Sequence, residues 1–279
     1  MTRGGAESRI PTLEELKRKG MLEQLEYLRR MEDLYRAQAK EGDVSALGRY
    51  IFGFPNDDFH DELARALREE TNAILALPPR VGKTQTVIHF CLSEIAKNPD
   101  IRILYVSAAD DMATLVSQSI RMCIESDERY RELFPHVKPD KRRGWSDGEW
   151  FVKREKPLKD PTFTALGKGG SVLSRGADLL IADDLISQPD EVATAYQRDK
   201  LSDWFNKVFL SRAEPQSRVF VVAARWASDD ISGRLEREML ANGKPKYKVI
   251  RFPAVAETPE GKKYLWENQR PAEYWEAKR

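Results

Sequence analysis

One short stretch of the chain combines features that constrain its fold strongly: an apolar run, two prolines, a Gly-Lys-Thr triplet and a helical pattern. Residues 73–77 suit a buried strand, and Pro78 and Pro79 end it because proline donates no hydrogen bond to a sheet. The triplet at 82–84 precedes apolar residues at helical spacing from 87 to 96. In such a strand–turn–helix unit, backbone N–H groups and the helix N-terminus bind phosphate.

The turn departs from the usual G-x-x-x-x-G-K-[ST] pattern because Leu77 stands in the position of the first glycine. An ordinary strand–turn–helix with an exposed lysine is therefore the alternative interpretation. In the phosphate-binding interpretation, Lys83 reaches the phosphates and the Thr84 hydroxyl holds Mg²⁺. The candidate nucleotide-binding residues are Pro79, Arg80, Val81, Gly82, Lys83, Thr84 and Gln85.

Composition places the chain among globular proteins without a global basic field. It has 279 residues, 33% charged and 41% apolar, and a formal net charge of +1. No run is long and apolar enough to span a bilayer, so no membrane partner is expected. Because the net charge is small, any contact with DNA requires a local patch, for which Lys138, Lys141, Arg142 and Arg143 are candidates beside the commoner alternative of a solvated face.

Strand and helix patterns alternate after the phosphate loop, which predicts a mainly parallel sheet covered by helices on both faces. Further strands are expected at 101–107, 179–184, 218–224 and 247–252, and helices at 113–125, 192–209 and 230–241. Residues 163–166 and 171–173 flank a glycine-rich turn and predict a hairpin.

The first 47 residues form a separate, highly charged region with leucines at roughly helical spacing. They predict one or two amphipathic helices, interrupted at Gly20, with Thr12 as an N-cap. This extension either docks on a partner or packs on the surface of its own domain. The expected organisation is a helical N-terminal extension at 1–47 and a nucleotide-binding domain at 48–279.

Two carboxylates end the strand at 179–184, and they supply what a nucleotide hydrolase needs beside a phosphate loop. Asp183 is the candidate Mg²⁺ carboxylate, and Asp184 is the candidate group that positions or deprotonates water. The pair follows the loop by about a hundred residues with one strand between them, which predicts an inserted strand between the loop strand and the acid strand. Together the motifs predict an ATPase that uses ATP and Mg²⁺, an α/β P-loop NTPase of the type with an extra catalytic carboxylate.

Arginines are the third component, because a guanidinium stabilises the charge that builds on the γ-phosphate. Arg80 lies inside the loop and is a candidate for action in cis. Arg175 precedes the acid strand and is a candidate finger supplied in trans to a neighbouring subunit. For each, a surface ion pair is the alternative.

The ordered motifs resemble the ATPase domain of the large terminase subunit of tailed bacteriophages. The resemblance rests on LPPRVGKT at 77–84, LLIADD at 179–184 and VVAARWASDDISGRL at 221–235, and it extends from about Gly53 to the C-terminus. That family has a phosphate loop that lacks its first glycine and carries an arginine. The family's coupling motif corresponds here to Ala224, Arg225 and Trp226.

The resemblance implies a motor that hydrolyses ATP to pump double-stranded DNA into an empty capsid. Its implied partners are the portal protein and the small terminase subunit, and its implied location is the cytoplasm of an infected bacterial host. It implies a homo-oligomeric ring on the portal and a monomer in isolation. By position, Lys83 and Thr84 bind phosphate and Mg²⁺, Asp183 is the metal carboxylate, and Asp184 is the catalytic acid.

Three departures from the family pattern qualify these expectations. Asp184 replaces the usual glutamate and is one methylene shorter, and Ala224 lacks the hydroxyl often found in the coupling motif. The nuclease domain of the family does not follow, so we expect an isolated ATPase domain that does not cleave DNA.

Two other functions fit the same residues. One is a helicase-like or DNA-repair translocase ATPase, which single-strand stimulation would indicate. The other is a docking module that binds nucleotide with little hydrolysis of its own. A small-molecule kinase is a weaker alternative, because nothing in the sequence resembles a lid or an acceptor pocket.

Overall fold

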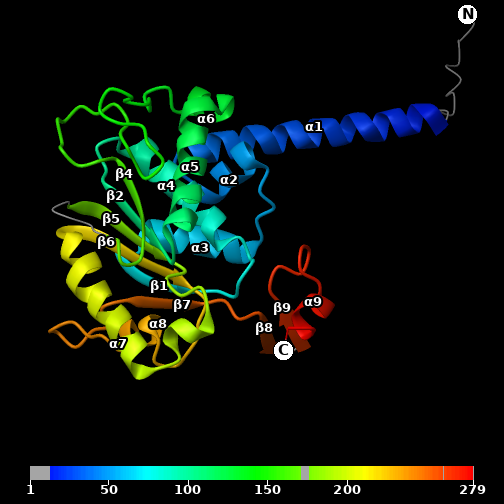
Figure 1. Cartoon of the computed structure of the whole chain (residues 1–279). Helices are drawn as coiled ribbons and strands as arrows, with labels where there is room; N and C mark the ends of the chain where they lie inside the picture. The colour runs from blue at the N-terminus through cyan, green and yellow to red at the C-terminus, as the bar shows by residue number, and fades with distance from the viewer. Residues whose placement is uncertain (1–12, 171–175, 260, 279) are drawn as a thin grey trace, which may run out of the picture.

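A seven-stranded sheet forms the centre of the protein (Figure 1). The computed structural model describes residues 13–170, 176–259 and 261–278. The strand order is β3-β4-β2-β5-β6-β1-β7, and every neighbouring pair is parallel except β3 with β4. The mainly parallel sheet is therefore confirmed. Its strands are β1 (Asn72–Ala76), β2 (Ile103–Ser107), β3 (Glu149–Trp150), β4 (Phe163–Gly167), β5 (Ala177–Asp183), β6 (Ala213–Ala223) and β7 (Lys248–Arg251).

Helices cover both faces of this sheet, as the alternation of strands and helices predicts (Figure 1). One face carries α2 (Val44–Phe52), α3 (Asp58–Glu69), α4 (Lys83–Lys97), α5 (Asp110–Ser126) and α6 (Glu128–Leu133), and the other carries α7 (Ala195–Trp204), a π-helical turn (Phe205–Phe209) and α8 (Ile231–Leu235).

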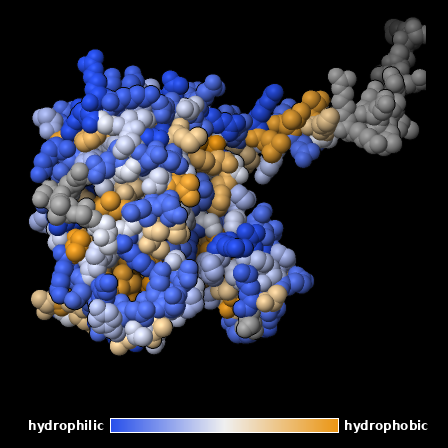
Figure 2. Space-filling view, viewed as in Figure 1, coloured by the Kyte–Doolittle hydropathy of each residue, from blue (hydrophilic) through white to orange (hydrophobic). Residues whose placement is uncertain are grey.

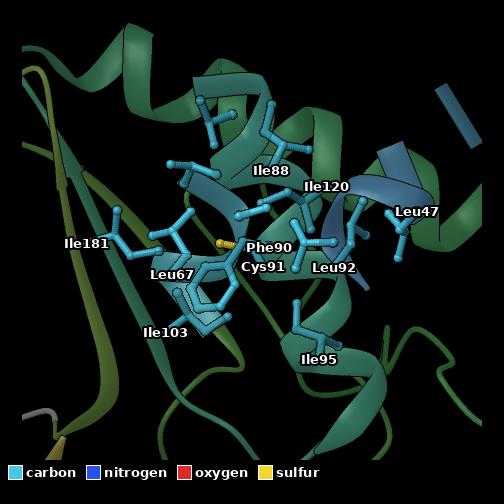
Figure 3. Close-up of a cluster of buried hydrophobic side chains, with 14 of the residues drawn as sticks. Leu47, Leu67, Ile88, Phe90, Cys91, Leu92, Ile95, Ile103, Ile120 and Ile181 are labelled. Atoms are coloured by element: carbon cyan, nitrogen blue, oxygen red, sulfur yellow. The ribbon is translucent and has the colours of Figure 1, made fainter. Parts of the chain in front are cut away.

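Buried side chains of each strand alternate between the two faces because successive residues of a strand point in opposite directions. In β5, Ile181 packs with the α4 cluster, whereas Leu180 and Ala182 pack with the cluster beneath α7. Figure 3 shows the cluster that includes Ile181, in which Phe90 and Cys91 of α4 lie against the sheet. Apolar side chains thus cover both faces of the sheet, and the candidate polar site lies at the strand ends.

A strand does lie between the loop strand β1 and the acid strand β5, but it is not the one that precedes the acids in the sequence. β6 pairs with both, so that Val222 of β6 is in register with Leu75 of β1 and with Asp183 of β5. The strand at 103–107, β2, lies on the outer side of β5. After β1 the chain therefore passes to β2 on the far side of β5, and β6 later takes the position between β5 and β1. Local sequence patterns do not encode that order.

Three local expectations need correction. The helix expected at 230–241 ends at Leu235, because the chain reverses at Gly243, whose φ of +75° and neighbouring Met239–Pro245 bridge form a turn. The helix α1 (Leu13–Lys40) continues through Gly20. The segment expected as a hairpin arm at 163–166 lies in β4, the second strand from one edge of the main sheet, and pairs with β2 and β3. Thr12 and residues 171–173 lie outside the described residues.

Two further parts extend from the central domain. A C-terminal lobe consists of the hairpin β8 (Val255–Thr258) and β9 (Gly261–Tyr264) with α9 (Ala272–Glu276), and no pattern in the sequence indicated it. The first half of α1 projects away from the domain, with apolar side chains exposed along it (Figure 2). No helix in the described ranges has the length and apolar character needed to cross a membrane.

The core predicts a large stability difference between two otherwise similar truncations. Phe90 is fully buried on α4 and meets Phe220 of β6 edge to face, with ring centroids 5.7 Å apart. We expect Phe90→Ala to lower the free energy of unfolding by about 3–5 kcal/mol. Leu115→Ala on α5, where the side chain is 63% exposed, is the control and is expected to change it by less than about 0.5 kcal/mol. Urea unfolding of both variants, followed by circular dichroism, measures the difference, and equal losses would contradict this core.

Candidate functional site

The phosphate loop, defined here as residues 77–82, joins β1 to α4 and depends on a glycine at its end. Gly82 has a φ of +77°, and a Cβ placed there would lie 2.5 Å from Cζ of Phe54 and 3.0 Å from Nε2 of His60. Only glycine suits this backbone conformation and this close approach. At the start of the loop, Leu77 is buried and donates its N–H to Ala223 O at 3.1 Å. An apolar anchor thus occupies the position where the usual pattern has glycine.

Lys83, the first residue of α4, points at one of the two acids of β5. Its Nζ lies 2.6 Å from Oδ1 of Asp184, and its side chain is only 5% exposed. The same Oδ1 accepts the backbone N–H of Ala224 at 3.2 Å. Asp184 has a φ of +45°, a conformation that costs energy for a residue with a side chain and that places its carboxylate at the end of the strand. One oxygen therefore joins α4 to the first residue after β6.

The neighbouring acid, Asp183, is buried and binds the second residue of α4. The Thr84 hydroxyl donates to Oδ2 of Asp183 at 2.8 Å, and the Tyr105 hydroxyl of β2 donates to the same oxygen at 2.8 Å. Burial, reinforced by the adjacent charge of Asp184, raises the pKa of Asp183 to about 6. Tyr105 was not predicted from the sequence; its only signal is a hydroxyl on an otherwise apolar strand.

The oxygens around Asp183 fit a small divalent cation. Oδ1 of Asp183 is buried and has no hydrogen-bond partner in the structure. Beside it lies the Thr84 hydroxyl, and Mg²⁺ binds oxygen ligands, often with only one or two from the protein. Within the described ranges there is no group of three or more His, Cys, Asp or Glu side chains that could hold a metal alone. Phosphate and water oxygens would have to complete the coordination.

A buried histidine supports the loop from behind. The backbone N–H of Asp57 donates to Nδ1 of His60 at 3.0 Å, so the hydrogen is on Nε2, which donates to Val81 O at 2.8 Å. Burial lowers the pKa of His60 to about 4, and the ring is neutral at pH 7. Phe54 packs edge to face on this ring, with centroids 5.1 Å apart. Both side chains therefore lie against the loop.

Among the remaining loop residues, Val81 is fully buried, whereas the two residues before it face outward. Pro79 and Arg80 are exposed, and the Arg80 guanidinium makes no hydrogen bond or ion pair with any residue that the structure describes. The Arg80 carbonyl accepts a long hydrogen bond of 3.4 Å from Arg270 of the C-terminal lobe. Gln85 is half-buried in the first turn of α4. Arg175 lies outside the described residues, so its role remains a prediction.

The residues predicted to form a coupling motif follow β6 and are held by a buried aspartate. Asp230 accepts the N–H groups of Trp226 at 2.9 Å and of Gly233 at 2.9 Å, and it caps α8. Arg225 binds Glu236 at 2.6 Å and Ser228 O at 3.0 Å, so its guanidinium is held away from Asp184. Of the motif, only the backbone N–H of Ala224 contacts the acid pair in this structure.

Comparisons with known proteins give distant similarities. No family model matches the chain. A segment of 121 residues, 43% of the chain, is 29% identical to a protein named "Terminase, large subunit" from Enterobacteria phage T3. The match covers 20% of that protein, so the chain matches about a fifth of the length of this relative.

Solved structures with a similar chain path include the large terminase ATPase domain of Thermus phage P74-26. An arginine-to-alanine mutant of that domain has a TM-score of 0.46 at 14% identity, covering 74% of this chain and 84% of that one. The domain without that mutation has a TM-score of 0.43 at 15% identity, covering 72% and 86%. A chain from a complex of S. cerevisiae Dbp5 with Nup159, Gle1, IP6 and ADP has a TM-score of 0.46 at 13% identity. That match covers 74% of this chain and 50% of the other. These likenesses are distant, and the roles of individual residues rest on the geometry above.

The neutral state of His60 predicts a specific pH dependence of stability. The unfolded chain binds a proton on this ring below about pH 6.5, whereas the folded chain does so only near pH 4, so acidification through this window favours unfolding. Between pH 7.5 and 5, His60→Gln should therefore lose about 1–2 kcal/mol less unfolding free energy than the unsubstituted chain.

The matched control is His136→Gln, because exposed His136 also contacts a backbone carbonyl, at 2.8 Å. It serves as the reference for the effect of replacing an exposed histidine outside the loop. Asp183 titrates in the opposite direction but is present in all three proteins, so their differences isolate the histidines. Urea unfolding at the two pH values decides, and parallel losses in all three proteins would rule out a proton-free His60.

Proposed function

We propose that the chain is an ATPase that uses ATP and Mg²⁺, and that its hydrolysis drives double-stranded viral DNA into a procapsid. One observation carries the ATPase proposal: the first two residues of α4, Lys83 and Thr84, each bind one of two adjacent carboxylates at the end of β5. A cation, a hydroxyl and two acids thus meet at the N-terminus of a helix, where phosphate binds favourably.

In the proposed reaction, the chain first exchanges an internal contact for a contact with its substrate. The Lys83 ammonium leaves Asp184 for the β- and γ-phosphates, and the backbone N–H groups of the loop bind the same oxygens. Thr84 Oγ1 and the free oxygen of Asp183 are the groups that would hold Mg²⁺, which would neutralise part of the phosphate charge. Tyr105 keeps the Asp183 carboxylate oriented through its hydrogen bond.

Asp184 then has the role of a water-orienting base. Once Lys83 has left, Oδ1 keeps a hydrogen bond only to Ala224 N, and the carboxylate is free to accept a proton from water. Its side chain is one methylene shorter than that of glutamate, and its φ of +45° turns the chain out of the strand conformation at this residue. Arg80 in cis and Arg175 in trans remain the candidates for stabilising charge on the γ-phosphate.

Two observations support the translocation part of the proposal. The relative from phage T3 is a large terminase subunit, and the residues Ala224, Arg225 and Trp226 occupy the place of the coupling motif. Its partners would be double-stranded DNA, the portal protein and the small terminase subunit, in the cytoplasm of an infected bacterium. A ring of copies would form on the portal from monomeric chains.

One observation favours the docking-module alternative. In this structure Lys83 binds Oδ1 of the carboxylate that hydrolysis needs, a closed arrangement in which this oxygen is taken by the ammonium group. A chain that stays closed after binding nucleotide would bind ATP and not hydrolyse it. Measuring turnover separates the two functions.

The first test of the proposed activity is steady-state ATP hydrolysis over a range of protein concentrations, with and without double-stranded DNA. We expect Lys83→Ala to abolish turnover, because the loop then lacks its phosphate-binding cation. Turnover of the unsubstituted chain that rises with protein concentration would support completion of the site by a neighbour. Turnover equal to that of Lys83→Ala at every concentration would refute the ATPase and favour the docking module.

The second test separates binding from chemistry. Asp184→Asn should keep ATP binding and lose hydrolysis by a factor of about 10²–10⁴, the usual contribution of a general base. Asp203→Asn is a control, because Asp203 is exposed on α7 and pairs with Lys207 at 2.7 Å. Fluorescent-nucleotide binding and phosphate release measure the two steps, and normal hydrolysis by Asp184→Asn would show that another group orients the water.

A further inference from the structure

The segment from residue 138 to residue 159, here called the basic lobe, concentrates positive charge at one edge of the sheet. It has eight Lys or Arg and only four Asp or Glu, whereas the whole chain has a net charge of +1. The rest of the chain is therefore net negative. The lobe includes β3 and the loops beside β4, at the opposite edge of the sheet from β7 (Figure 1).

Most of this charge is not neutralised within the described part of the chain. Lys141 pairs with Glu125 of α5, and the Asp147 carboxylate is taken by Arg121 of the same helix. Within the described ranges, the remaining cations with no carboxylate within 4.0 Å are Lys138, Arg142, Arg143, Lys153, Arg154 and Lys156. Outside the lobe, by contrast, many arginines form ion pairs, for example Arg102 with Asp178.

Two of these arginines are held in place by groups that leave their charge intact. Arg154 donates to three backbone carbonyls, those of Pro99, Ile101 and Asp160, and Arg143 donates to Leu158 O. Both guanidinium groups lie over the ring of Phe151, whose centroid is 4.2 Å from Cζ of Arg143 and 5.9 Å from Cζ of Arg154.

Burial lowers the pKa of Arg154 to about 10, so it is still a cation at pH 7. Neutral carbonyl groups hold these arginines in place without neutralising their positive charge, and the result is a preorganised cationic surface.

The lobe is also rigid where it joins the sheet. Trp150 of β3 is fully buried and stacks on Phe163 of β4, with ring centroids 5.2 Å apart and planes 4° from parallel. The backbone N–H of Lys153 donates to Lys138 O at 2.8 Å, which places these two exposed lysines on adjacent segments. A fixed backbone under the lysines, together with the two arginines already held in place, lowers the entropy cost of binding an array of phosphates.

The lobe is physically connected to the nucleotide site by β4. This strand begins at Phe163, beneath the lobe, and ends at Gly167. The next residue, Lys168, donates from Nζ to Leu185 O at 2.8 Å, one residue after Asp184. Five strand residues span roughly 16 Å, so the lobe and the hydrolysis site lie at the two ends of one short element.

We infer that the basic lobe is a surface that binds the phosphate backbone of double-stranded DNA, without reading its sequence. The inference rests on the proposed function for the choice of DNA as the polyanion, and on the unneutralised, prefixed cations for the surface. Contacts of this kind go to phosphates and release counterions, so binding depends steeply on salt and little on sequence.

The test compares DNA binding by variants that remove three charges from different places. Lys138→Ala, Arg142→Ala and Lys153→Ala are combined in one lobe variant, because these side chains are exposed and make no hydrogen bond within the described part of the structure. The control variant combines Lys200→Ala, Lys244→Ala and Lys248→Ala, three exposed lysines on α7 and around β7. Fluorescence anisotropy of a labelled 30-base-pair duplex is measured with each full-length chain from about 50 to 200 mM salt.

We expect the lobe variant to bind at least about tenfold more weakly at 50 mM salt and to lose about 2–3 units from the slope of log affinity against log salt. The control variant should bind as the unsubstituted chain does. Equal affinity of the lobe variant and the unsubstituted chain, or equal losses in both variants, would overturn the inference, as would absence of DNA binding by the unsubstituted chain. ATP hydrolysis without DNA, measured on the same preparations, is expected to be unchanged, and its failure in the unsubstituted chain would count against the ATPase alone.

Discussion

The meeting of two carboxylates with the N-terminus of one helix is the constraint on which the rest of the site depends. Asp183 is buried at a strand end, where an isolated charge is costly, and hydroxyls of Thr84 and Tyr105 offset that cost. Asp184 is matched by Lys83, itself almost fully buried. This arrangement requires β1 and β5 to end at the same edge with one strand between them, which is the sheet order observed. The contacts of the site therefore depend directly on the strand order of the sheet.

The sequence predicts those parts of the structure that short-range patterns encode. Apolar runs locate β1, β2, β5, β6 and β7, and the Gly-Lys-Thr triplet locates the turn into α4. The identity of the strand between β1 and β5 was not predictable, because pairing between segments more than a hundred residues apart leaves no local pattern. Local patterns also do not reveal the roles of Tyr105 and His60, which arise only where β2 approaches Asp183 and where α3 approaches the loop. The helix expected beyond Leu235 failed for a different reason, since turn geometry at Gly243 overrides helical spacing.

Two segments far apart in the sequence, α3 and the C-terminal lobe, support the phosphate loop. His60 of α3 holds the Val81 carbonyl, and Arg270 of the C-terminal lobe reaches the Arg80 carbonyl. Trp266 of that lobe packs edge to face on the His60 ring, with centroids 4.8 Å apart, and donates to Pro55 O. A loop with few internal hydrogen bonds gains its shape from these neighbours. Its geometry is consequently sensitive to changes at positions that no phosphate would touch.

The ion pair between Lys83 and Asp184 also affects how tightly a nucleotide can be held. Asp184 competes with phosphate for the same ammonium group, so part of the attraction between Lys83 and an incoming nucleotide is used to break a contact that already exists. The proposed ATPase would bind ATP less tightly than a pocket with a free lysine. The same competition favours departure of ADP, because the protein recovers its own ion pair when the product leaves. A motor that must cycle repeatedly benefits from a site that closes upon itself once it is empty.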